Sequence, residues 1–318
     1  MTEFIYFGAI ALTVCLNAVG ASIGQGLASK TALDAIDRQP SAQQDIARTA
    51  MLGLALIETT AIIGAFIAAL LLFDSQNLIT SAYSNLATIG IVCALCLSGF
   101  VVGIVSSFPT QAACISVARQ PFFGQKILRF MIITQSLIQT PIIFGLIITL
   151  FIKNLMPSIH TTAESLRLIA SGLCIGLGSI GPAIGLGLFA RQACTSIGTN
   201  KQAYGKILSF TLISQAIIET PIIFSLIIAI LILVVTPGKA PLSLLDGTTM
   251  FCAGLCMGLG TIGPGISSGK TAAAACQFIA LNPKNYSTLS RTSMFAQGLI
   301  ETSAIYSIII AFGLLLFR

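Results

Sequence analysis

Eight long apolar runs dominate this chain of 318 residues and restrict it to folds that lie in a membrane. A transmembrane helix needs roughly 20 apolar residues, and each run is long enough. The composition agrees, because 55% of the residues are hydrophobic and 8% are charged, whereas soluble domains carry about 25% charged residues. We therefore expect an all-α membrane protein with eight transmembrane helices. The predicted spans cover about residues 4–29, 48–73, 84–118, 128–152, 168–192, 205–235, 245–276 and 290–317.

The spans belong to a fourfold internal repeat. Glu58, Gln139, Glu219 and Glu301 follow one another at intervals of 81, 80 and 82 residues, and each has an Ile before it and a Thr after it. Self-similarity of this kind indicates copies of one structural unit. We therefore predict four tandem helical hairpins. They occupy residues 1–78, 79–159, 160–240 and 241–318.

Short polar turns connect the two helices within each predicted hairpin. They are Arg38-Gln39-Pro40, Arg119-Gln120-Pro121, Thr199-Asn200-Lys201 and Leu281-Asn282-Pro283. Of the 16 Lys and Arg residues, 12 lie on the turn side. Basic residues favour the cytoplasmic side, so we expect cytoplasmic turns and both termini on the opposite side. Because no basic residue precedes the first apolar run, we expect the first helix to be retained rather than cleaved as a signal peptide.

Three glutamates, Glu58, Glu219 and Glu301, lie inside predicted spans, and they are the main candidates for function. A carboxylate near the centre of a spanning helix costs on the order of 3 kcal/mol, so such residues usually mark a functional site. No Lys or Arg lies at the same predicted depth. The low dielectric then favours a protonated or cation-bound carboxyl group, which suits an ion carrier. The alternative is a structural polar contact between helices.

Polar side chains accompany these glutamates on the second helices. The candidates for supporting groups at the ion sites are Thr59, Gln215, Thr220, Gln297, Thr302, Ser303 and Tyr306. Pro221 lacks an N–H, so the carbonyl of Ile217 is left free to accept a proton or to ligate a cation. The alternative for each Thr and Gln is an ordinary hydrogen bond within its own helix.

Glycine is abundant in the first helix of each hairpin, often at four-residue spacing, as at Gly20 and Gly24. Such spacing lets membrane helices approach closely, which would suit a tight inner ring inside an outer one. Two glycine runs, starting at Gly176 and Gly258, match a dinucleotide-binding pattern. They lack the preceding strand and the later acidic residue, so we expect no nucleotide there. The nine Cys lie nearly all in apolar segments and suit packing. We predict no cofactor, and no metal site is certain.

Each hairpin resembles the rotor proteolipid of F-type ATP synthases. The resemblance rests on the glycine-rich first helix, on the carboxylate midway along the second helix, and on the Arg-Gln-Pro turns at 38–40 and 119–121. Four fused copies cover essentially the whole chain.

The resemblance implies a non-catalytic, ion-translocating subunit that forms a membrane rotor ring with copies of itself. Its turns would contact the central-stalk subunits of the soluble ATPase. The implied contact residues are Arg38, Gln39, Pro40, Arg119, Gln120 and Pro121. A stator a-type subunit would supply the essential arginine. The other partner is membrane lipid, with no role for nucleic acid, and the expected location is an energy-coupling membrane, the bacterial plasma membrane.

The chain departs from the family pattern at Gln139, which occupies the carboxylate position of the second hairpin. That copy should carry no titratable ion, so a full turn of the ring moves three ions per chain rather than four. The third and fourth hairpins lack Arg-Gln in their turns, which puts their stalk contacts in question.

The transported ion is predicted to be H⁺, with Na⁺ as the alternative. The family's sodium pattern includes a glutamine on the first helix, which Gln25 matches only in the first hairpin, where the third has Leu186. Sodium needs several oxygen ligands at every site, whereas a proton needs fewer. Two other functions remain open: a secondary transporter built from repeats, which would more often show inverted repeats, and a purely structural ring.

Overall fold

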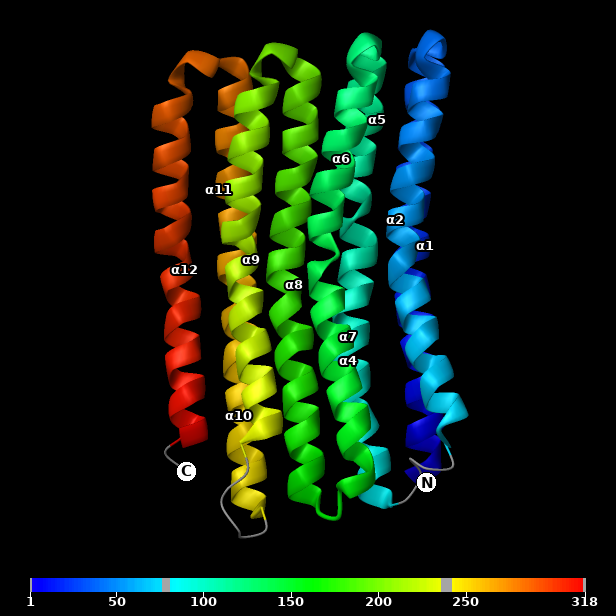
Figure 1. Cartoon of the computed structure of the whole chain (residues 1–318), viewed down its shortest axis with the longest axis vertical. Coiled ribbons are helices and arrows are strands. Elements are labelled where there is room, and N and C mark those ends of the chain that lie inside the picture. The colour runs from blue at the N-terminus through cyan, green and yellow to red at the C-terminus, as the bar shows by residue number, and fades with distance from the viewer. Residues whose placement is uncertain (1, 76–80, 236–241, 317–318) are drawn as a thin grey trace.

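The structure is a computed structural model that describes residues 2–75, 81–235 and 242–316, and all regular structure within these ranges is helical (Figure 1). In these ranges it has eight helices that are long and apolar enough to cross a membrane. The prediction of an all-α protein with eight spans is thus confirmed. The predicted hairpin boundaries at 78/79 and 240/241 and the predicted end of the last span at 317 lie outside the described residues.

Each hairpin consists of a first helix, a short turn and a second helix. The first helices are α1 (Thr2–Arg38), α4 (Ala82–Val105) continued by α5 (Ser107–Arg119), α8 (Thr162–Thr199), and α10 (Leu244–Gly260) continued by α11 (Ile262–Leu281). The second helices are α2 (Gln43–Phe73), α6 (Gly124–Ile138) continued by α7 (Thr140–Leu155), α9 (Tyr204–Val234), and α12 (Tyr286–Leu316). Three-residue 3-10 turns at Pro40–Ala42, Pro121–Phe123, Lys201–Ala203 and Pro283–Asn285 join them.

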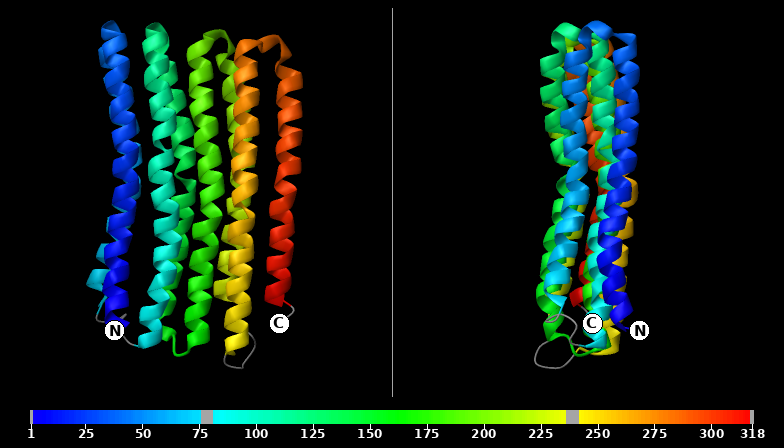
Figure 2. Two further views of the ribbon diagram at one scale, coloured as in Figure 1. Left: turned by 180° about the vertical axis from the view of Figure 1, so that it is seen from behind. Right: turned by 90° about the vertical axis from the view of Figure 1, so that its right-hand side faces the viewer.

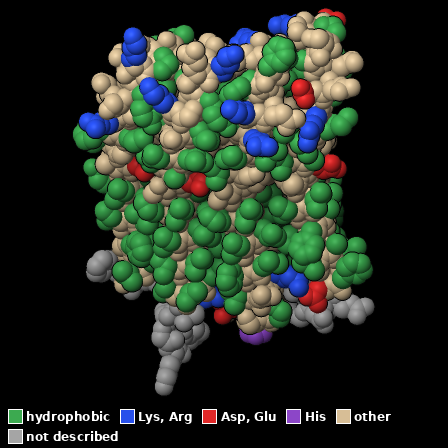
Figure 3. Space-filling model, turned by 45° about the horizontal axis from the view of Figure 1, so that its top comes forward, with side chains coloured by type: hydrophobic (Ala, Val, Ile, Leu, Met, Phe, Trp, Pro, Cys, Tyr) green, Lys and Arg blue, Asp and Glu red, His purple; other side chains and the backbone are tan. Residues whose placement is uncertain are grey.

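The helices extend beyond the predicted spans at the turn end. The helix α1 ends at Arg38 rather than near residue 29, and α8 ends at Thr199 rather than near 192. Spans of 34–38 residues are about 50–57 Å long, whereas the hydrocarbon core is about 30 Å thick. The predicted spans are too short because hydropathy identifies only the apolar part of each helix, whereas the helix continues through polar residues. Figure 3 shows Lys and Arg gathered towards the turn end, beside a band of hydrophobic side chains.

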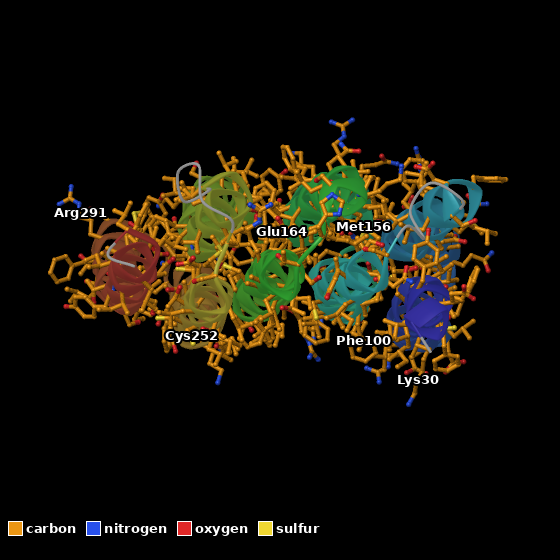
Figure 4. All side chains as sticks on the ribbon, turned by 90° about the horizontal axis from the view of Figure 1, so that it is seen from below. Lys30, Phe100, Met156, Glu164, Cys252 and Arg291 are labelled. Carbon is orange, nitrogen blue, oxygen red and sulfur yellow. The ribbon has the colours of Figure 1, made fainter. Side chains whose placement is uncertain are left out.

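The helices form two rows, which are seen end-on in Figure 4. The first helices pack against one another in chain order, α1 on α4, α4 on α8, and α8 on α10 and α11. Each second helix packs on the first helix of its own hairpin. The side view in Figure 2 shows the resulting slab, with the N-terminal and C-terminal ends of the chain at the same end of the helices. The first and fourth hairpins therefore form the two edges of the slab.

Glycine allows the first helices to touch through their backbones. A Cβ on Gly20 would lie 2.6 Å from the carbonyl oxygen of Phe100, and one on Gly185 would meet the carbonyl of Gly265. Gly172 faces the backbone of Gly90 in the same way. Because a side chain has no room at these points, the glycines set the spacing of the row. The predicted close approach of glycine-lined helices is confirmed.

Three helical rods are interrupted at single residues, Ser106, Gln139 and Thr261. Each interruption lies two or three residues before a proline, which lacks the N–H for the helical hydrogen bond and crowds the preceding turn. Pro221 lies inside the continuous helix α9. A proline two residues after the repeated position therefore accompanies an interrupted helix at Gln139 and a continuous helix at Glu219.

Replacing Gly185 by Ala should lower stability by about 1–3 kcal/mol, because the new methyl group must displace the backbone of the next first helix. Thermal loss of helical circular dichroism in detergent measures the change. Gly298→Ala is the matched control, since Gly298 lies on an exposed face of α12 with nothing near its missing Cβ. That change should be neutral or stabilising by up to about 1 kcal/mol. Equal effects of the two substitutions would contradict backbone packing as the source of stability.

Candidate ion-binding sites

The four repeated positions lie midway along the second helices, but the structure surrounds them differently. Glu58 on α2 is exposed, and Glu219 on α9 is half-buried. Glu301 on α12 and Gln139, between α6 and α7, are each 8% exposed. None of the three glutamates forms an ion pair within the described part of the chain.

Gln139 is fixed by two hydrogen bonds. Its Nε2 donates to the carbonyl of Leu56 on α2 at 2.9 Å and to Oγ of Ser106 at 3.0 Å. The amide therefore connects the second hairpin to the preceding one and to its own first helix. An amide does not titrate, and both of its N–H groups are in use. At this position the structure therefore has a polar contact between helices.

Glu219 lies at the joint between the second and third hairpins. Its Oε1 accepts a hydrogen bond of 3.1 Å from Oγ1 of Thr140, which starts α7. Thr140 directly follows the repeated position of the second hairpin, and its hydroxyl thus reaches the carboxylate of the third hairpin. The site is therefore built from two consecutive hairpins.

Glu301 has a carboxylate oxygen, Oε1, that is buried without a hydrogen-bond partner among the described residues. The same holds for Oγ of Ser268 on α11 and for Oε1 of Gln297, one turn earlier on α12. Ser268 corresponds in the repeat to Ser106, which contacts Gln139 in the second hairpin. Buried polar atoms without partners are costly, and Oε1 of Gln139 also has no partner among the described residues.

The other predicted supporting groups bond mainly to backbone. Gln25 donates to the carbonyl of Leu54 at 3.4 Å, one turn before Glu58. The hydroxyls of Thr59, Thr220, Thr302 and Ser303 donate to carbonyls of their own helices. The side chain of Tyr306 is 66% exposed. A role for these groups as ion ligands stays a prediction.

The glutamines one turn before the repeated positions connect neighbouring hairpins. Gln135 donates to the carbonyl of Gly53 at 2.9 Å, and Gln215 donates to the carbonyl of Thr134 at 3.2 Å. Gln297 donates to Oγ of Ser214 at 3.4 Å. We call these three contacts the glutamine ladder. The sequence analysis placed Gln215 and Gln297 at the ion sites and did not predict these contacts. One signal for them is present in the sequence: the first hairpin, which has no preceding hairpin to contact, has Leu54 at the equivalent position.

The turns also connect neighbouring hairpins. Nε2 of Gln120 donates to the carbonyl of Gly198 at 2.8 Å, and Nδ2 of Asn200 donates to the carbonyl of Ala280 at 2.9 Å. Gln39 instead bonds Oγ of Ser41 at 2.8 Å. A cavity of about 160 Å³ lies between the first two turns, lined by Thr31, Asp34, Ala35, Arg38, Gln39, Ile115, Ala118 and Arg119. Pro40 and Pro121 each start a 3-10 turn. The predicted contact of these residues with a stalk stays a prediction.

The family model for the C subunit of ATP synthase matches four segments of the chain, residues 8–72, 89–152, 169–232 and 251–314. Together these segments make up more than half of the chain, and each contains one of the four repeated positions.

Individual relatives match one hairpin length of this chain. The ATP synthase c subunit of Thermotoga petrophila is 45% identical over 64 residues, which is 20% of this chain and 75% of the relative. The c subunit of Dehalococcoides mccartyi is 40% identical over 73 residues, 23% of this chain and 96% of the relative. That of Chloroflexus aurantiacus is 39% identical over 69 residues, 22% of this chain and 91% of the relative. The chain therefore belongs to the family of ATP synthase c subunits, as four fused copies of the family hairpin.

Proposed function

We propose that this chain, as a rotor subunit, moves H⁺ across the membrane on Glu58, Glu219 and Glu301, and so couples ion flow to ATP synthesis or hydrolysis. The observation that carries the proposal is the recurrence of a carboxylate midway along three of the four second helices. A family member supplies the rotor of an F-type ATP synthase. In this role the chain itself performs no ATP chemistry. It works in the energy-coupling membrane of a bacterium, with its turns in the cytoplasm against the central stalk.

The chemistry follows from the charge of the carboxyl group. A protonated carboxyl is neutral and can remain in hydrocarbon, whereas an ionised one needs a nearby positive charge or water. A stator arginine would provide that charge as each site passes it. The amide of Gln139 cannot take part, because it has no proton to exchange at neutral pH.

A proton fits the three sites better than Na⁺ does. Sodium needs several oxygen ligands at each site, and Glu219 has one side-chain hydroxyl donor, Thr140 Oγ1. The residue equivalent to Gln25 in the third hairpin is Leu186, which is fully buried and offers no oxygen in its side chain. A rotor is limited by its weakest site. Sodium remains the alternative ion.

Replacing Glu58, Glu219 and Glu301 by Gln should abolish ATP-linked transport that is sensitive to carbodiimide, because the carriers lose their exchangeable charge. Ion uptake into vesicles that contain the whole complex measures it. Glu3→Gln is the control, since this exposed carboxylate lies in the first turn of α1, and transport should be retained. Unchanged transport in the triple variant would favour a secondary transporter or a purely structural ring.

Sodium should not protect the glutamates from carbodiimide at neutral pH. The measurement is labelling of each carboxyl, read by peptide mass spectrometry with and without Na⁺. Gln139 provides an internal blank, because an amide does not form the adduct. Clear protection by Na⁺ at Glu58, Glu219 and Glu301 would reverse the choice of ion.

The ion-to-ATP ratio should be lower than that of a ring of the same size with four carriers per chain. At about 2.3 kcal/mol per charge per 100 mV, three charges gather roughly 7 kcal/mol per 100 mV, and four gather roughly 9. This favours ATP-driven pumping or a larger driving force. Chains per ring, counted by mass spectrometry of the intact complex, together with ions moved per ATP, check the ratio. Separate single-hairpin subunits in the ring would invalidate the calculation.

A further inference from the structure

Three exposed basic side chains lie close to the level of the repeated positions on the row of first helices. We call the surface of this row that points away from the second helices the first-helix face, and Figure 4 shows Lys30 extending from it. Ser106 marks the level, because its Oγ bonds Gln139. The equivalents of Ser106 in the repeat are Gln25, Leu186 and Ser268. Lys30 and Arg191 lie five residues beyond this level, and Lys270 lies two beyond it, which corresponds to about 8 Å and about 3 Å along a helix.

On the second helices, the basic residues towards the turns lie much farther from the same level. Arg48, Arg129 and Arg291 each come ten residues before a repeated position, and Lys206 comes 13 residues before Glu219. Ten residues of helix are about 15 Å long, which is half of the roughly 30 Å of hydrocarbon in a bilayer. In a layer centred on the repeated positions, these arginines therefore lie at the boundary, whereas the three cations of the first-helix face lie inside it.

The direction of the first helices keeps these cations deep. Each Cα–Cβ bond of a helix tilts towards the N-terminus, and the first helices begin at the end opposite the turns. Their side chains therefore lean away from the turns, whereas those of the second helices lean towards them. Arg191 shows the result, since its guanidinium carbon lies 5.9 Å from the ring centroid of Phe108. The position of Phe108 in the repeat is three residues nearer the level of the repeated positions, so Arg191 extends inwards rather than towards the turns.

Two cavities beside these cations combine positive charge with apolar side chains. One of about 490 Å³ lies between α1, α5 and α8, and one of about 520 Å³ lies between α8 and α11. Leu27 precedes Lys30 by one turn in the first cavity, and Leu188 precedes Arg191 by one turn in the second. Asp34 is the one carboxylate among the described residues that line the two cavities. Within the described ranges, no ion pair involves any of the three cations, so their charge is available to a ligand.

We propose that these two cavities bind the phosphate groups of anionic phospholipids, whose acyl chains extend past Leu27 and Leu188 towards the end of the helices opposite the turns. The inference goes beyond the proposed rotor function and does not depend on it. Phosphate suits the cavities because Arg and Lys form strong charge-assisted hydrogen bonds with it. A lipid is the occupant because each cavity has a cation and a leucine one turn apart, and the exposed side chains of Val19 and Ile23 continue the apolar surface. A soluble anion would match only the cationic part.

Titration of phosphatidylglycerol into the delipidated protein in a neutral detergent, followed by native mass spectrometry, tests the site. Lys30→Gln, Arg191→Gln and Lys270→Gln should each weaken binding about fivefold, because that is what one basic residue contributes to the attraction of an anionic lipid. Lys30→Arg should bind as the wild type does, because it keeps the charge. The matched control is Arg129→Gln, which removes the same charge from a second helix and should leave this binding unchanged. Diacylglycerol, which has no phosphate, should not bind.

Three results would overturn the proposal. One is equal affinity of the wild type and the three Gln variants, each with the circular dichroism of the wild type. Another is complete displacement of phosphatidylglycerol by an equal concentration of inorganic phosphate, which would make the ligand a soluble anion. The third is an acidic polypeptide that purifies with the protein and cross-links to the first-helix face in place of lipid. The transport measurements on the triple Gln variant of the glutamates test the rotor function separately.

Photolabelling of the unaltered protein measures the depth of the site without any variant. Phosphatidylglycerol with a diazirine in its headgroup should modify residues 27–31 and 188–192 on the first helices, identified by peptide mass spectrometry. On the second helices the same probe should modify residues near Arg48 and Arg129, at the boundary of the hydrocarbon, which provides the internal comparison. Labelling of the first helices confined to within one turn of Arg38 and Arg119 would overturn the deep phosphate site.

Discussion

Backbone contact between neighbouring first helices is the constraint on which the other features depend. Inside a bilayer, apolar side chains gain little by leaving lipid for protein, so association relies on close packing and on polar contacts. Gly20 against Phe100 and Gly185 against Gly265 allow neighbouring helices to approach until their backbones touch. The narrow row then sets the spacing of the second helices, so that Thr140 of one hairpin reaches Glu219 of the next. The geometry at the repeated positions of the second helices therefore depends on how tightly the first helices pack.

The four repeated positions nevertheless have different environments. Gln139 is held by two hydrogen bonds, Glu219 by one from a side chain, and Oε1 of Glu301 by none within the described chain. A carrier that must release its ion cannot be held firmly in one state, because each extra hydrogen bond to that state slows exchange. A residue that exchanges nothing can be held firmly. Under the proposed function, the two hydrogen bonds of the Gln139 amide suit a position that holds helices together and carries no ion.

The spans and the repeated positions could be predicted from the sequence, because both follow from patterns that recur along the chain. The eight spans follow from the apolar runs, and the four repeated positions follow from the 80–82 residue spacing. The partners of Gln215 and Gln297 could not be predicted, since a glutamine can bond its own helix or a neighbour and the sequence does not show which helix is near. The interruptions at Ser106 and Thr261 depend on local packing, as the uninterrupted helix at Pro221 shows. The exposure of Glu58 was missed because a repeat treats all copies as equal, whereas the chain has two edges.

Fusion of the hairpins allows the second copy to have Gln139 where the other three have a glutamate. In a ring of identical single hairpins, a change of Glu to Gln would remove every carrier at once, because one sequence supplies all positions. Under the proposed function, the same change in the fused chain removes one carrier in four and leaves Glu58, Glu219 and Glu301 in place. Each repeated position can then differ from the others, as Gln139 does with its hydrogen bonds to Leu56 and Ser106. The covalent connection that holds three joints together is therefore also what allows the four positions to differ.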